Sequence, residues 1–295
     1  MRLAALLFPI LLSALSATAF AQPSPFTDRL LRDEKLWGDG NAELSVFKAI
    51  EPRYGTPREA EVRHYLVRED FAPEAPVKAD DWQRAGTYPV IKLNQIWSVP
   101  TGSYRYDQGV SLFWRAAADA TSQSAAGSLF RFSHTTSDTC GLTYKRADLA
   151  DGTWRYRAFT YWENGDALDH RTPAPAGGLF YDELPFKLRT LDWGKLTIFE
   201  APLLPSLVGS KPDAGLLWQS AKFNIEKLRD GWRVTMRHAG GVDRFIFDAE
   251  PPHALQSWQR ADGGKLERTH LVRLPYWRLN QPGDERYAVP GATYP

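Results

Sequence analysis

One stretch decides the fold of this chain, and it reads Trp232-Arg233-Val234-Thr235-Met236-Arg237-His238. Large apolar side chains at every second position alternate with charged or polar ones, a pattern typical of a β-strand with one face in a core and the other in water. Turn-forming sequences flank it, Arg229-Asp230-Gly231 before and Ala239-Gly240-Gly241 after. The stretch therefore predicts one strand of an antiparallel meander.

The same alternation extends in both directions along the chain. Segments 216–228, 242–247, 254–260 and 265–274 complete a five-stranded antiparallel meander with it. Further strands are expected at 42–50, 60–69, 89–99, 103–115, 128–134, 142–146, 154–162 and 195–200. With about twelve strands and little helical periodicity, the chain is predicted to be mainly β, a large curved antiparallel sheet with a few short helices.

Two short helices and two long loops interrupt the strands. Residues 182–189 form the best helix, because Asp182 can cap it, acids occupy its first turn and bases its last. Residues 27–37 are a second helix candidate. Segments 69–88 and 164–178 are rich in Pro, Ala, Gly and charge, which favours long surface loops or lids. No repeat or linker divides the chain, so residues 22–295 are expected to form a single β-rich domain.

The N-terminus has the pattern of a secretory signal. A basic start at Arg2, an apolar run from Leu3 to Phe20 and an Ala-x-Ala site ending at Ala21 predict a signal peptide over residues 1–21. We therefore expect a periplasmic or secreted protein cleaved near Ala21. Because the apolar run is interrupted and barely long enough to span a bilayer, membrane contact through binding stays open, but integral insertion is not expected.

Charge balance, cysteine content and aromatic content limit which ligands and partners are expected. Without Arg2, 35 basic residues face 35 acidic ones with no long block of one sign, so nucleic acid is not an expected partner. The single cysteine, Cys140, cannot form an internal disulfide, and its sequence neighbours give no reason for a reactive thiol. Eleven Trp, twelve Tyr and fifteen Phe supply core material, and aromatic walls also suit sugar or lipid ligands.

Local motifs for catalysis or cofactor binding do not appear in the sequence. The six His stand apart without metal-ligand spacing, and no nucleophile elbow or phosphate loop occurs. We therefore predict no cofactor, no metal site and no assignable catalytic residue. Two carboxylates that meet only in space leave no signature, so a glycan-cleaving pair drawn from Glu163, Asp166 or Asp182 stays open.

Strand parity places several polar side chains on apolar faces. Gln95 alternates in step with Trp97, and Gln108 with Tyr106 and Trp114, while His134 shares its parity with Phe130 and Phe132. A buried polar group without a partner costs about 1–3 kcal/mol, so these groups either pair locally, hold water or line a ligand cavity. The ligand-binding residues proposed on this basis are Gln95, Trp97, Tyr106, Gln108, Trp114 and His134.

Two resemblances add to this reading. Lys92-Leu93-Asn94-Gln95, Pro100-Thr101-Gly102-Ser103-Tyr104, Cys140-Gly141 and Asp182-Glu183-Leu184-Pro185 together resemble a family of exported bacterial proteins of unassigned function. More distantly, the meander and the run from Phe245 to Pro252 leading into Leu255 resemble the LolA-like periplasmic half-barrels. That resemblance implies one sheet curled around a helix or an acyl chain.

Three functions remain open from the sequence. The leading hypothesis is a non-enzymatic periplasmic carrier for a hydrophobic or amphiphilic ligand, such as a lipid or a lipid-linked glycan, because a curved aromatic wall with inward amides could hold it. The alternatives are an enzyme acting on cell-envelope glycans, and a structural envelope protein whose sheet edge pairs with another chain. The sequence does not fix the oligomeric state.

Overall fold

The computed structural model describes residues 24–118, 126–139, 141–213 and 215–289. Fifteen strands in these residues form one sheet with the order β8-β7-β6-β5-β4-β3-β2-β1-β15-β14-β13-β12-β11-β10-β9, which does not close into a ring. The strands are β1 Ala42–Arg53, β2 Thr56–Phe71, β3 Tyr88–Pro100, β4 Arg105–Arg115, β5 Leu129–Asp138, β6 Gly141–Ala150, β7 Thr153–Thr160, β8 Leu168–Pro173, β9 Leu179–Phe180, β10 Ile198–Leu204, β11 Gln219–Lys227, β12 Gly231–His238, β13 Gly241–Asp248, β14 Leu255–Gln259 and β15 Lys265–Leu274.

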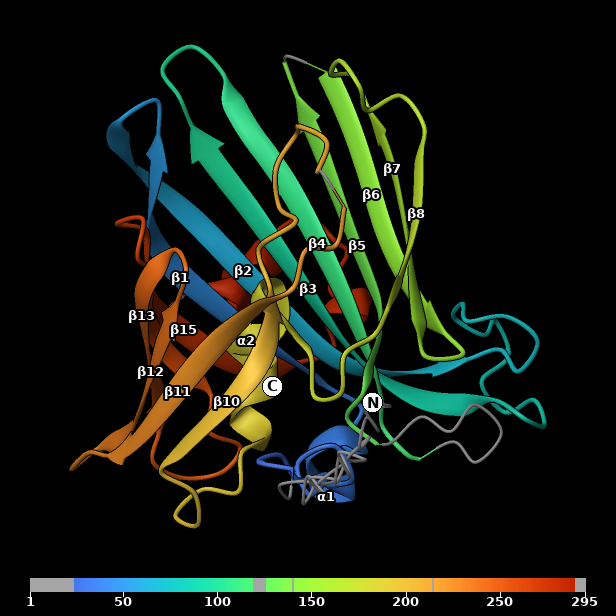
Figure 1. Ribbon diagram of the computed structural model, residues 1–295. Helices are drawn as coiled ribbons and strands as arrows, with labels where there is room; N and C mark the ends of the chain where they lie inside the picture. Colours follow the sequence, from blue (N-terminus) through green and yellow to red (C-terminus); the bar gives the residue numbers. More distant parts are fainter. Residues whose placement is uncertain (1–23, 119–125, 140, 214, 290–295) are drawn as a thin grey trace, which may run out of the picture.

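The prediction of a mainly β chain with one large sheet is confirmed. Neighbouring strands are antiparallel except for β9 and β10, which run parallel. The sheet curves strongly, so it has a concave inner face and a convex outer face (Figure 1). Strand β1 lies at its centre, paired with β2 on one side and with β15 on the other, which joins the two halves of the chain.

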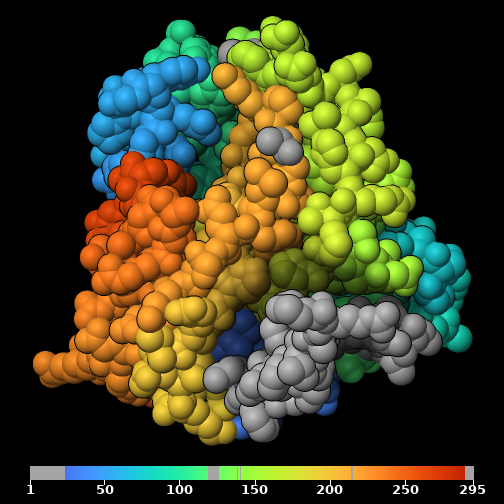
Figure 2. Space-filling view, viewed as in Figure 1, coloured from blue at the N-terminus to red at the C-terminus, as the bar shows by residue number. Residues whose placement is uncertain are grey.

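A short helical segment lies inside the curve of the sheet. It consists of the 3-10 turn Tyr181–Glu183, the helix α2 Leu184–Lys187 and the 3-10 turn Leu188–Thr190, which confirms a helical segment at 182–189 (Figure 1). Leu184, Phe186 and Leu188 are buried in it. Residues 205–213, drawn in orange in Figure 2, lie between the strands on either side. The chain thus fills much of its own concave face.

Two apolar clusters occupy the inner face. One packs Leu184 and Leu188 against Phe223, Phe245 and their neighbours, and the other packs Phe186 against Trp114 and the strands on that side. The helical segment therefore contributes to both clusters. Because each large ring removes roughly 150–250 Å² from water, the aromatic residues are the main material of this core.

The remaining short helices lie near the chain ends. Helix α1 Glu34–Trp37 is much shorter than the helix expected over 27–37, and Asp33 caps it by accepting hydrogen bonds from Lys35 N and Leu36 N. Two 3-10 turns, Tyr276–Arg278 and Asp284–Ala288, lead toward the C-terminus, and their aromatic side chains pack on Leu44 and Val46. No helix in the described part of the chain is both long and apolar enough to span a bilayer.

The structure corrects two details of the strand pattern. Segment 164–178, expected to be a loop, contains the edge strand β8 and leads into β9. In β5 a bulge occurs where Phe113 pairs with Arg131 and Trp114 pairs with Leu129. Phe130 is the extra residue, and its side chain packs with Phe71 on the outer face instead of sharing the face of His134.

Candidate functional site

A row of polar side chains crosses the inner face. The strand register aligns Ser45, His64, Gln95, Val110, His134 and Lys145 on β1 to β6. All six side chains are buried. Burial without a partner lowers the pKa of His64 to about 3, with a smaller contribution from the nearby Arg189 cation. Whether this row forms a ligand site depends on the hydrogen-bond partners of its other polar side chains.

Gln95 and Asp182 connect the row to the segments that fill the curve. Gln95 Nε2 donates a hydrogen bond to the backbone oxygen of Asp182 at 2.8 Å. The Asp182 carboxylate accepts hydrogen bonds from Ser206 Oγ at 2.6 Å and Leu207 N at 2.9 Å. Complete burial raises the pKa of Asp182 to about 6, against the effect of these hydrogen bonds. Gln95 therefore positions the helical segment.

His134 and Lys145 contact segment 205–213, the second segment that fills the curve of the sheet. Gly209 N donates to His134 Nε2 at 3.1 Å, so Nδ1 carries the proton and donates to Gly109 O at 3.1 Å. Lys145 Nζ donates to Leu207 O at 3.0 Å and pairs with Asp213 at 2.8 Å. Burial lowers the pKa of His134 to about 4. Both side chains anchor segment 205–213 against the sheet.

The six residues proposed from the sequence do not share one cavity. Gln95, Trp97 and Gln108 line a cavity of about 40 Å³, which has room for water but not for a lipid chain. Trp114 Nε1 donates to Glu183 Oε2 at 2.7 Å, and the Tyr106 hydroxyl hydrogen-bonds to that of Tyr54. All six are buried on the inner face, and their role in binding a ligand stays a prediction.

The carboxylates considered for glycan cleavage lie in different environments. Asp182 is buried and hydrogen-bonded beneath segment 205–213. Glu163 and Asp166 are exposed in the turn between β7 and β8. Within the described residues, no three His, Cys, Asp or Glu side chains gather as metal ligands. Cys140 and the expected cleavage site at Ala21 lie outside those residues.

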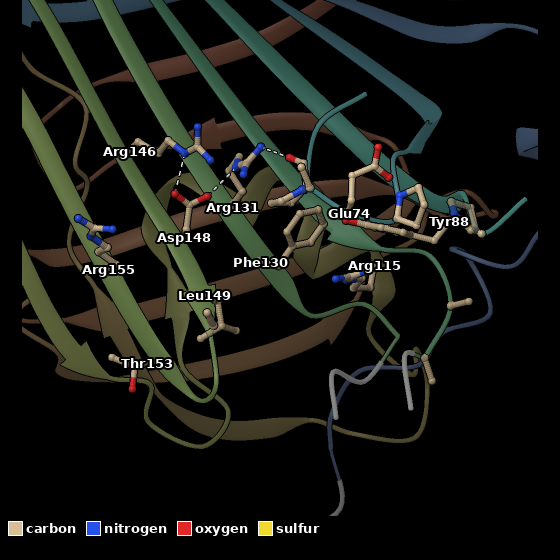
Figure 3. A pocket seen from close by; sticks show the side chains of 18 of the residues that line it. Glu74, Tyr88, Arg115, Phe130, Arg131, Arg146, Asp148, Leu149, Thr153 and Arg155 are labelled. Carbon is tan, nitrogen blue, oxygen red and sulfur yellow. Dashed lines mark hydrogen bonds and ion pairs between the residues drawn. The ribbon is translucent and has the colours of Figure 1, made fainter. Parts of the chain in front are cut away.

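A large hollow lies on the outer face. It is an open groove of about 840 Å³ between the β2–β3 loop and strands β4 to β8 (Figure 3). Its apolar wall includes Tyr88, Phe130 and Leu149. Its charged wall consists of two acids, Glu74 and Asp148, and of six arginines, namely Arg115, Arg131, Arg146, Arg155, Arg157 and Arg171. We call this region the arginine groove.

Strand register brings like charges face to face in the arginine groove. Arg146 on β6 is directly opposite Arg157 on β7, and Arg155 on β7 is directly opposite Arg171 on β8. Like charges in directly opposed positions destabilise a sheet. On their other sides Arg155 is opposite Asp148 and Arg157 is opposite Asp169, and Arg155 Nε donates to Asp169 at 2.9 Å. These two acids offset part of the positive charge, but arginines still outnumber acids among the residues that line the groove.

Asp148 is the shared partner of three arginines. Its carboxylate accepts from Arg131 Nε at 2.7 Å and Arg146 Nε at 2.6 Å (Figure 3). It also accepts from Arg157 Nη2 at 3.0 Å. Burial alone would raise the pKa of Asp148, but hydrogen bonds from Arg146 and Arg131 hold it below its usual value. One carboxylate thus orients three guanidinium groups.

Some donors of these arginines are buried without a partner. Arg131 is buried, and although its Nη1 donates to Pro76 O, its Nη2 has no partner in the described part of the chain. Arg157 Nε is also buried and has no hydrogen-bond partner among the described residues. Arg115 places its guanidinium 4.0 Å from the centre of the Tyr88 ring and 5.0 Å from that of Phe130. The groove therefore places guanidinium groups beside aromatic rings, a combination suited to an anionic ligand.

Sequence reasoning missed the arginine groove for identifiable reasons. Arg155 and Arg157 alternate with buried Trp154 and Tyr156, so their outward direction is readable in the sequence. The bulge moves Phe130 to the outer face, against its parity in the sequence, and Arg171 was expected in a loop although it lies on β8. Two sides of the groove were therefore not predicted. The β2–β3 loop that covers the groove agrees with the loop expected over 69–88, although β2 continues to Phe71.

Comparison with known proteins does not identify the site. No protein-family model matches the chain, and no curated protein or solved structure is significantly similar to it. Any function must therefore be inferred from the geometry itself.

Proposed function

We propose that this protein binds an anionic amphiphile without chemically changing it, holding the anionic group in the arginine groove. The observation that carries the proposal is the set of six arginines that line the groove with only two acids, Arg146 being directly opposite Arg157. A phosphate or carboxylate in the groove would accept hydrogen bonds from the accessible guanidinium nitrogens and relieve the repulsion between Arg146 and Arg157.

The apolar wall favours an amphiphile over a small inorganic anion. Tyr88, Phe130 and Leu149 line the groove beside the arginines, and Phe130 also packs on Phe71 and Phe113 beneath it. A lipid or a lipid-linked glycan with an anionic group presents both kinds of surface. The volume of about 840 Å³ is within the range of pockets that hold small organic ligands.

The proposal moves the carrier hypothesis from the inner face to the outer face. A LolA-like half-barrel, as the sequence resembles, would hold its ligand inside the curve, but here the helical segment and segment 205–213 occupy that space. We propose a half-barrel of this kind whose inside is filled by its own chain. We propose that it acts in the periplasm or outside the cell. N-terminal sequencing of the native protein tests this location, because the mature chain should then begin near Gln22.

The two alternative functions have less support. Of the three carboxylates considered for a glycan-cleaving enzyme, Asp182 is buried and hydrogen-bonded to Ser206 and Leu207, which leaves only Glu163 and Asp166 in an exposed turn. Pairing of a sheet edge with another chain is disfavoured at β8, because this strand carries Asp169 and Arg171 and ends at Pro173. Charged residues and proline are common means of protecting an exposed edge from such pairing.

Calorimetric titration with dodecyl phosphate and dodecyl maltoside, both below their micelle-forming concentrations, tests the proposal. Dodecyl phosphate should bind and the uncharged dodecyl maltoside should bind much more weakly. Arg157→Gln should weaken the binding of dodecyl phosphate by about tenfold, because a charged hydrogen bond contributes about 1.5–3 kcal/mol.

Arg233→Gln is the matched control, because Arg233 is exposed to a similar extent but lies on β12, paired with Glu226. It should leave binding unchanged. Equal binding of both detergents, or equal weakening by both variants, would contradict the proposal.

A further inference from the structure

A patch of exposed apolar side chains lies on the outer face at one end of β6 and β7. Tyr144 and Phe159 are directly opposite each other, and Tyr161 N donates to Leu142 O at 3.2 Å. Leu142 is 68% exposed, Tyr161 65% and Phe159 53%. Leu142, Tyr144 and Phe159 line a shallow, mainly apolar depression of about 490 Å³. We call Leu142, Tyr144, Phe159 and Tyr161 the rim patch.

The rim patch is continuous with the arginine groove. Arg146 follows Tyr144 by two residues on β6, and Arg157 precedes Phe159 by two residues on β7, so all four side chains share the outer face. Two residues along a strand span about 7 Å. One strip of the surface therefore changes from apolar and aromatic at the rim to cationic one step inward.

We propose that the rim patch docks the protein on the surface of an anionic lipid bilayer. This inference rests on the proposed function in one respect, since it names the place from which an anionic amphiphile would be collected. In this orientation Leu142 and Phe159 enter the boundary of the acyl chains, while Tyr144 and Tyr161 lie at the level of the head groups. Arg146 and Arg157 then face the lipid phosphates.

Charge and composition favour a bilayer as the occupant. Large exposed apolar groups mark interaction surfaces, and aromatic rings flanked by cations are typical of the membrane interface. Beside the rim, Lys211 lies 5.2 Å from the centre of the Trp162 ring, which adds another cation next to an aromatic group. Asp166 also lines the depression, so the attraction to anionic lipid must come from Lys211 and the arginines.

Vesicle flotation of the full chain tests the docking surface. The wild type should bind vesicles of phosphatidylcholine mixed with phosphatidylglycerol more strongly than vesicles of phosphatidylcholine alone. The double variant Leu142→Ser with Phe159→Ser should lose about tenfold or more in binding, because two large apolar groups no longer enter the lipid. Leu217→Ser is the control, since Leu217 is 63% exposed but lies in segment 205–218.

The double variant Arg146→Gln with Arg157→Gln measures the cationic contribution. It should reduce the preference for phosphatidylglycerol by about fivefold for each charge removed. Circular dichroism checks that each variant is folded, which is expected because the rim side chains are exposed. Failure of the wild type to bind either vesicle, or equal binding by wild type and the Leu142/Phe159 variant, would overturn the inference. A dimer held together through the patch would also do so.

Titration with monomeric dodecyl phosphate separates this inference from the proposed function. Binding of dodecyl phosphate that survives in the Leu142/Phe159 variant while vesicle binding is lost supports both. Vesicle binding without any binding of dodecyl phosphate would contradict the proposed function and support the docking surface. Binding of dodecyl phosphate without vesicle binding would support the proposed function and contradict the docking surface.

Discussion

On the inner face of the sheet, the buried cations Arg189 and Lys145 are each paired with a carboxylate, whereas the arginine groove on the outer face is lined by six arginines and only two acids. Arg189 forms a bidentate ion pair with Glu43, with Nη1–Oε1 and Nη2–Oε2 distances of 2.8 and 2.9 Å, and its Nε donates to Pro252 O. By contrast, Arg131 and Arg157 share Asp148 with a third arginine. Buried polar groups that satisfy each other specify a fold, while an excess of one charge needs a partner from outside.

Removing one member of the inner ion pair should have the largest effect. Glu43→Gln leaves the Arg189 cation buried without a counter-charge, which should lower the free energy of unfolding by about 3–5 kcal/mol. Urea denaturation measures the change. Glu226→Gln, in the exposed pair with Arg233, should cost about 1 kcal/mol or less.

The double variant Glu43→Leu with Arg189→Met separates charge from packing. It should be more stable than Glu43→Gln, because both charges are removed from the buried site together. A loss as small for Glu43→Gln as for Glu226→Gln would mean that the inner pair is solvated, and the contrast between the two faces would disappear.

The two inner amides should differ, although the sequence gives them the same role. Gln95→Leu removes the donor to Asp182 O and should lower the free energy of unfolding by about 1–3 kcal/mol. The Gln108 side chain has no hydrogen bond within the described part of the chain, so Gln108→Leu should cost less than about 1 kcal/mol. Urea denaturation of both variants compares them directly. Equal losses would contradict the assignment of the Asp182 backbone oxygen as the partner that distinguishes Gln95 from Gln108.

Alternation along the strands predicts which residues face inward, but it does not predict what they meet there. Gln95 and His134 are correctly placed on a buried face, yet their partners belong to residues 182 and 209, which no periodic pattern connects to them. Phe130 was assigned the wrong face, because one extra residue in β5 changes the parity. Side-chain periodicity describes one strand at a time and contains no information on bulges or on segments that fill a concave face.

The arginine groove could not be predicted from the sequence for a related reason. The outward arginines on β6 and β7 look like the solvated face of ordinary strands, each alternating with buried residues. Only the register places Arg146 opposite Arg157 and Arg155 opposite Arg171. The excess of charge is a property of the pairing between strands, and it becomes visible only when the strands are aligned.

The smallest effect on stability is expected from Arg157→Gln, and it tests the outer face most directly. The change removes one hydrogen bond to Asp148 and the attraction to Asp169 on β8, and it also removes the repulsion from Arg146. The lost attraction and the lost repulsion oppose each other, so the free energy of unfolding should change by no more than about 0.5 kcal/mol. Because salt screens attraction and repulsion alike, this small difference from wild type should depend little on ionic strength. Arg233→Gln should lose most stability at low salt, since Arg233 lies between Glu226 and Ile246 and only an attraction is removed. Urea denaturation of both variants at low and high ionic strength provides the measurement. If Arg157→Gln lost well over 1 kcal/mol at every salt concentration, the groove arginines would be structural like Arg189, and the case for an anionic ligand would lose its main support.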